Sequence, residues 1–161
     1  MNYKIVFKTV GRLLWAEAAL LCLPLFVSLY YKENLFSVYL IVIGLLLGTG
    51  AVMNLPKPEK RTIYAREGFV IVSLSWILLS FFGSLPFVFS QQIPSIVDAF
   101  FETVSGFTTT GATILTNIEA MSKSLLFWRA FTHWIGGMGI LMFVLAFLPQ
   151  RMKTMGFSRL L

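Results

Sequence analysis

The chain has 161 residues, of which 57% are hydrophobic and only 12% are charged. Soluble domains carry about 25% charged residues, so this chain cannot cover itself with polar surface, and its composition indicates a bilayer. Its single cysteine, Cys22, excludes an internal disulfide. The net charge of +6 would suit a nucleic-acid partner, but the positions of the basic residues favour a membrane protein instead.

Four apolar segments approach or exceed the roughly 20 residues that a helix needs to cross a bilayer. They are Leu13–Tyr31, Leu35–Leu55, Phe69–Ser90 and Ser124–Leu148. We interpret the first as a retained helix rather than a cleaved signal peptide, because it is long and Glu17 interrupts it. We expect it to bend near Pro24. In the second, Gly44 and Gly48 lie one turn apart, a spacing that we interpret as a helix-packing surface.

The basic residues predict the orientation of these segments. Most of them flank the segments on one side, namely Lys4, Lys8, Arg12, Lys57, Lys60, Arg61, Arg66, Arg151, Lys153 and Arg159. Only Lys32, Lys123 and Arg129 are left for the opposite half. The positive-inside rule therefore predicts a cytoplasmic N-terminus. A basic patch for nucleic acid or for a regulatory partner is the alternative.

The segment between the third and fourth apolar runs, residues 91–123, is not a simple polar loop. Ser95 and Asp98 have the spacing of a helix start, apolar residues follow at helical intervals, and we expect Gly106 to end the helix. The pattern predicts a short helix over about 95–106, near 18 Å long. That length is too short to span and suits a re-entrant element.

The sequence FTTTGATIL (residues 107–115) follows this helix. Irregular backbone is tolerated at membrane depth only where it is buried in protein or lines a water-filled path. Glycine and threonine can present a column of oxygens, as potassium filters do, and the C-terminal end of the short helix would favour a cation. Asp98, Glu102 and Glu119 would add negative charge near the outer mouth. An ordinary surface turn remains the alternative.

Two stretches, FFETVSGFTTTGATIL (residues 100–115) and LLFWRAFTHWIGGMGILMF (residues 125–143), carry a family resemblance. They resemble the first pore repeat of the Trk/Ktr/HKT potassium transporters, in the bacterial TrkH-like branch. The resemblance covers nearly the whole chain and implies an all-α membrane protein. Two leading transmembrane helices would precede one repeat of a potassium-channel-like fold, consisting of an outer helix, a pore helix with its filter loop, and an inner helix.

The resemblance also divides the chain into parts. Residues 1–55 would form the N-terminal helix pair, 56–68 a basic cytoplasmic loop, 69–148 the first repeat, and 149–161 a basic cytoplasmic tail. Within the repeat, the pore helix would lie at about 95–106 and the filter at about 108–113.

The resemblance assigns ion-binding carbonyls to Thr109, Thr110, Gly111 and Ala112. Potassium channels have an aromatic residue where this chain has Ala112, which puts strict discrimination against sodium in doubt. Residues expected to support the filter or line the outer mouth are Thr108, Thr113, Asp98, Glu102 and Arg129. Arg129 either pairs with Glu102 and holds the filter or lies at the outer interface, and His133 is expected to be structural.

The function implied is potassium transport through a channel-like path, to which this chain supplies one of four filter strands. We expect the chain to be an N-terminal piece of a longer transporter, or else several copies or partners to enclose the pore. A non-conducting membrane scaffold or regulatory subunit that retains the fold is the alternative, and no catalytic constellation in the sequence indicates an enzyme. The resemblance further implies a bacterial inner-membrane location, a dimer, and a cytosolic nucleotide-binding regulatory subunit. Contact with lipid is expected, and a cofactor, a transition-metal site or a nucleic-acid partner is not.

Overall fold

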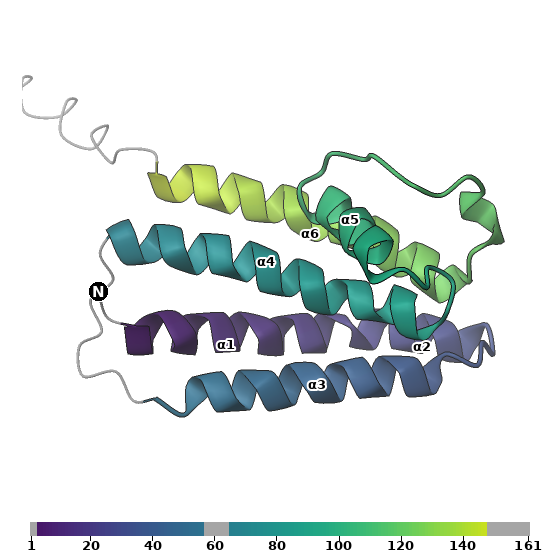
Figure 1. Cartoon of the computed structure of the whole chain (residues 1–161), viewed down its shortest axis with the longest axis horizontal. Helices are drawn as coiled ribbons and strands as arrows, with labels where there is room; N and C mark the ends of the chain where they lie inside the picture. Colours follow the sequence, from purple (N-terminus) through teal and green to yellow (C-terminus); the bar gives the residue numbers. More distant parts are fainter. Residues whose placement is uncertain (1–2, 57–64, 148–161) are drawn as a thin grey trace, which may run out of the picture.

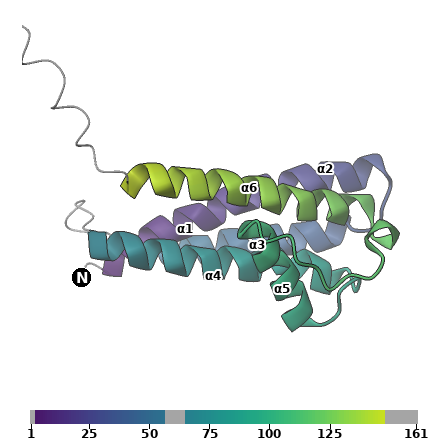
Figure 2. The ribbon, with the colours of Figure 1, turned by 90° about the horizontal axis from the view of Figure 1, so that it is seen from above.

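The computed structural model of the chain describes residues 3–56 and 65–147. Its elements are α1 (Tyr3–Leu20), α2 (Cys22–Tyr30), α3 (Phe36–Asn54), α4 (Ala65–Phe89), α5 (Ile96–Phe107), the short 3-10 helix η1 (Ile118–Ala120) and α6 (Lys123–Phe147). The long helices run along one common direction, and the short α5 is set between them near one end (Figures 1 and 2). The described residues form only helices and connections, so the expected all-α fold is confirmed.

Three helical stretches are long and apolar enough to cross a membrane. They are Tyr3–Tyr30, Phe36–Asn54 and Arg66–Phe89. The fourth predicted span ends at Leu148, which lies outside the described residues, so its crossing stays a prediction. The predicted loop 56–68 falls largely outside the described residues, and the predicted tail 149–161 lies entirely outside them.

Helix α1 begins ten residues before the apolar segment predicted at Leu13. Its buried residues Val6, Val10, Leu14 and Ala18 recur every fourth position, so one apolar stripe continues through the basic part of the helix. Lysine and arginine are good helix formers and leave this stripe intact. The helix therefore extends beyond the purely apolar run.

The first span is divided at Leu21 into α1 and α2, and a bend near Pro24 stays a prediction. Pro24 lies three residues later and has no N–H to donate to the carbonyl of Leu20. Its ring would also collide with that carbonyl in a straight helix. The break between the two helices lies at Leu21, next to this carbonyl, and the chain then continues as α2.

Close packing of α1 on α3 occurs at Gly11 and Gly50, and not at the predicted pair Gly44 and Gly48. A Cβ on either Gly11 or Gly50 would lie 2.9 Å from the carbonyl oxygen of the other. Gly44 and Gly48 are exposed on α3, with no atom within 4 Å of a built Cβ. Glycines do mediate the contact between two helices, but the spacing of glycines in a sequence does not reveal which face of a helix meets its neighbour.

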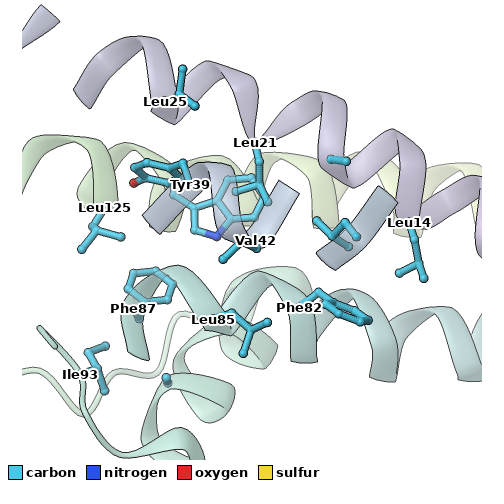
Figure 3. Packing of buried hydrophobic residues seen from close by; sticks show 14 of the residues in the cluster. Leu14, Leu21, Leu25, Tyr39, Val42, Phe82, Leu85, Phe87, Ile93 and Leu125 are labelled. Atoms are coloured by element: carbon cyan, nitrogen blue, oxygen red, sulfur yellow. The ribbon is translucent and has the colours of Figure 1, made fainter. Parts of the chain in front are cut away.

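One apolar cluster joins the N-terminal helices to the rest of the chain. Its buried residues come from all six α-helices and include Leu14, Leu25, Tyr39, Val42, Phe82, Phe87, Ala99 and Leu125. Figure 3 shows these side chains converging between the helices. The cluster fixes α4 and α6, the two helices on either side of the re-entrant segment, against the leading pair.

Candidate ion-binding loop

Helix α5 is the short element predicted between the third and fourth apolar segments. The hydroxyl oxygen of Ser95 accepts a hydrogen bond from the N–H of Asp98 at 3.4 Å, so Ser95 is the N-cap. The helix has 12 residues, which is about 18 Å. Gly106 does not end it, contrary to the prediction, because the helix continues through Phe107.

Gly106 is instead one of two glycines at which α5 and α6 come into close contact. A Cβ on Gly106 would lie 2.2 Å from the hydroxyl oxygen of Thr132, and one on Gly136 would lie 2.0 Å from the carbonyl oxygen of Phe107. A side chain at Gly136 would collide with backbone, and one at Gly106 would require Thr132 to shift. Gly137 has no such contact, since its nearest atom would lie 3.9 Å away.

This contact sets the depth at which α5 ends. Gly136 lies 13 residues after Lys123, the first residue of α6, which places it about 20 Å along that helix. From the end of α5 the chain returns to η1 and the start of α6, beside the connection from which α5 began (Figure 1). The segment therefore enters from one end of the bundle, turns at the middle of α6 and leaves at the same end, as expected of a re-entrant loop.

Backbone angles alternate in sign at the turn. Thr109 has a φ of +57° and Gly111 of +77°, whereas Thr110 and Ala112 have negative φ. Such alternation gathers successive N–H groups on one side of the chain. The N–H groups of Thr110 and Gly111 both point to the carbonyl oxygen of Ser105, at 3.0 and 3.5 Å.

The carbonyl groups of the same residues have no such partner. Within the part of the chain that the structure describes, the carbonyl oxygens of Thr109, Thr110 and Gly111 accept no hydrogen bond. Residues 108–114 are all exposed. A threonine in the left-handed region costs about 1–3 kcal/mol, so the surrounding contacts hold Thr109 in a conformation that it would not otherwise adopt.

Side-chain hydroxyls complete the turn. Thr108 donates to the carbonyl oxygen of Val104 at 2.7 Å, and its hydroxyl lies 2.8 Å from that of Thr110. The carbonyl oxygen of Ala112, the fourth predicted ligand, accepts a hydrogen bond from the hydroxyl of Ser105 at 2.6 Å. The end of α5 thus contacts the loop through both its backbone and its side chains.

Glu102 joins three elements behind the loop. Its Oε1 lies 2.5 Å from Nε of Arg129 on α6, so of the two alternatives for Arg129 the structure has the ion pair with Glu102. Its Oε2 accepts from the hydroxyl of Thr113 at 3.0 Å and from the N–H of Ile114 at 3.2 Å. The Glu102 side chain is 1% exposed and that of Arg129 is 17% exposed, so little water screens the pair.

The other acidic residues lie apart from this cluster in the chain. Asp98 is in the first turn of α5 and Glu119 is in η1. His133 Nδ1 lies 3.1 Å from the carbonyl oxygen of Arg129, one turn earlier on α6. Since a carbonyl only accepts, Nδ1 carries the proton, and this local bond agrees with a structural role.

Sequence reasoning missed Ser105, Glu33 and Gln92. Glu33, between α2 and α3, accepts from the N–H groups of Lys123 and Ser124 at 2.6 and 3.2 Å and also from the Ser124 hydroxyl. Gln92 bonds in both directions with Ser122. The first N–H groups of a helix lack partners within the helix and require other acceptors. For α6 the acceptor is Glu33, about 90 residues earlier in the chain, and no local sequence pattern identifies it.

Comparison with known proteins places this loop in a family. The TrkH family model, described as a cation transport protein, matches residues 33–157. The chain is 35% identical to a Trk system potassium uptake protein TrkH from Halomonas elongata and 36% identical to that of Escherichia coli K12, each over 92% of this chain and 31% of the relative.

A solved structure agrees with these matches. The crystal structure of the potassium transporter TrkH from Vibrio parahaemolyticus superposes with a TM-score of 0.86 at 37% identity, over 92% of this chain and 32% of that one. The chain therefore spans about a third of the length of the relatives that it matches. The extent of the family match and the close agreement in structure show that the chain belongs to the TrkH family of cation transport proteins.

Proposed function

We propose that this chain supplies one ion-coordinating strand to a potassium-transporting path across the membrane, with Thr109, Thr110, Gly111 and Ala112 as the ion-binding segment. The observation that carries the proposal is that three successive carbonyl oxygens, those of Thr109, Thr110 and Gly111, are unpaired in the described part of the chain, while the N–H groups of Thr110 and Gly111 donate to α5. A cation that has shed its hydration water needs such a row of oxygens. Relatives named as potassium uptake proteins support potassium as the ion.

The electrostatics of α5 also favour a cation at this place. The C-terminal end of a helix carries a partial negative charge, and α5 ends at Phe107, directly before the segment. Glu102 and Arg129 neutralise one another behind the loop, so their pair supports the loop without adding net charge. The membrane potential would contribute about 2.3 kcal/mol per charge per 100 mV to passive movement along such a path.

A single strand cannot surround an ion. The exposed residues 108–114 must be covered by protein or by a water-filled path if they lie within the membrane. Further repeats of a longer chain, or further copies, would supply this cover. The dimer, the cytosolic nucleotide-binding subunit, the inner-membrane location and the cytoplasmic N-terminus that the resemblance implies belong to the same proposal.

The test of the proposal is the substitution Gly111→Val. Gly111 has a φ of +77°, a backbone conformation that a branched side chain strains. A Cβ built at Gly111 meets no atom within 4 Å, so the substitution acts through the backbone of the loop and not through a side-chain collision. The control is Gly44→Val on α3, where a Cβ also meets no atom within 4 Å and the φ is not positive. Both variants are introduced at the chromosomal locus, so that the chain is made with whatever completes it.

Uptake of potassium and of rubidium is then measured in cells that lack their other potassium uptake systems. The proposal expects Gly111→Val to lower uptake or change its ion preference, and Gly44→Val to leave both unchanged. A non-conducting scaffold predicts normal transport in both variants, and that result would reject the ion-binding assignment.

A further inference from the structure

Ser105 contacts the loop in two ways at once. Its carbonyl oxygen receives the N–H groups of Thr110 and Gly111, and its hydroxyl donates to the carbonyl oxygen of Ala112 at 2.6 Å. The residue lies in the last turns of α5 and is 4% exposed. A buried hydroxyl with an available acceptor keeps its hydrogen bond, because leaving it unmade is costly.

The two contacts have opposite effects on neighbouring carbonyl groups. Holding the N–H groups of Thr110 and Gly111 against α5 leaves the carbonyls of Thr109, Thr110 and Gly111 unpaired. The hydroxyl contact instead draws the next carbonyl, that of Ala112, to the same side as those N–H groups. Ala112 therefore differs from the three residues before it, although all four are adjacent in the sequence.

We propose that Ser105 is a positioning residue that determines ion specificity, because its hydroxyl withdraws the Ala112 carbonyl and leaves this strand with three oxygens for the ion. This inference rests on the proposed function and narrows it: within the proposed segment Thr109 to Ala112, the Ala112 carbonyl is the one that does not bind the ion. In one of the two accounts of potassium selectivity, discrimination between cations is set by the number and field strength of the coordinating carbonyl groups, and this inference uses that account. A larger set of weak-field oxygens favours potassium over the smaller sodium ion.

The substitution Ser105→Ala removes the hydroxyl and frees the Ala112 carbonyl to join the other three. The conservative variant Ser105→Thr keeps a hydroxyl. The matched control is Ser84→Ala, since Ser84 is also buried and its hydroxyl also donates at 2.6 Å to a carbonyl, that of Phe81 in its own helix α4. All three are introduced at the chromosomal locus, and the measured quantity is the ratio of potassium to sodium uptake, which does not depend on the amount of protein.

We expect Ser105→Ala to raise this ratio by about two- to tenfold, the range that corresponds to one hydrogen bond. Ser105→Thr and Ser84→Ala should keep the ratio of the unmodified protein. An unchanged or lower ratio in Ser105→Ala would overturn the inference, as would the same increase in Ser105→Thr. Complete loss of uptake in Ser105→Ala with a normal amount of protein would also overturn it, because three carbonyls should remain in place.

The outcome with Gly111→Val separates this inference from the function on which it rests. Normal transport in Gly111→Val rejects the proposed function itself. Altered transport in Gly111→Val combined with an unchanged ratio in Ser105→Ala keeps the ion-binding segment and rejects only the role of Ser105.

Discussion

The contact between α5 and α6 at Gly136 predicts a large effect of a single methyl group. In Gly136→Ala the new Cβ would lie 2.0, 2.6 and 2.9 Å from the carbonyl oxygen, carbonyl carbon and Cα of Phe107. Real Cβ atoms essentially never approach another atom within 3.0 Å, so the end of α5 must move away by about 1 Å or more. The atoms met are backbone and have no rotamer through which to escape. Overpacking of this kind costs about 1–3 kcal/mol.

Gly137 provides the control one residue further along α6. The nearest atom to a Cβ at Gly137 would be Cγ2 of Thr109 at 3.9 Å, which is ordinary contact. Both substitutions lie inside α6 and should gain about 0.8–1.0 kcal/mol from helix propensity. This gain cancels in the comparison, so the two variants should differ by the overpacking cost alone, roughly 1–3 kcal/mol in the free energy of unfolding. Unfolding of the purified protein in detergent micelles, followed by circular dichroism during titration with dodecyl sulfate, measures this difference. Equal stability of the two variants would refute the close approach of α5 to α6.

Two acidic residues give further predictions of opposite sign. Glu102→Gln leaves the largely buried guanidinium of Arg129 without its counter-charge, so we expect the free energy of unfolding to fall by about 3 kcal/mol and hydrogen exchange at the Ile114 amide to become faster. The same change at exposed Glu119 should have neither effect. Equal effects at both sites would contradict the role of the ion pair. Glu17 is 3% exposed and neither carboxyl oxygen has a hydrogen-bond partner in the described part of the chain, so Glu17→Leu should leave stability unchanged or raise it by about 1–3 kcal/mol. The same micelle titration measures the change, and a loss of stability would contradict the lack of a partner for this carboxyl.

The amino-acid sequence predicts the order of elements well, because length and apolar composition are properties of each segment by itself. The short helix was expected at 95–106 and is found one residue later at each end, with Ser95 as its cap. The pairing of Glu102 with Arg129 was also within reach, since two opposite charges in an apolar chain have few other partners.

What the sequence did not predict depends on which surfaces meet. Gly106 has the appearance of a helix terminator, yet it is needed for the approach of Thr132 from α6. Gly44 and Gly48 have the spacing of a packing face, but α1 meets α3 at Gly11 and Gly50 instead. In each case the glycine allows a neighbouring helix to approach the backbone closely, but the arrangement of the helices determines at which glycine this occurs.

The same distinction explains why threonine and glycine at the loop carry so little information on their own. Thr109 and Gly111 have positive φ, and the N–H groups of Thr110 and Gly111 donate to the carbonyl oxygen of Ser105, while the carbonyl oxygens of Thr109, Thr110 and Gly111 stay unpaired in the described part of the chain. Gly106 and Gly136 let the end of α5, to which Ser105 belongs, lie against the middle of α6. The unpaired oxygens are therefore a product of contacts on the opposite side of the loop. A loop with the same sequence but without those contacts would pair its carbonyl groups with its own N–H groups or with water. Such a loop would have no carbonyl oxygens fixed in place for an ion.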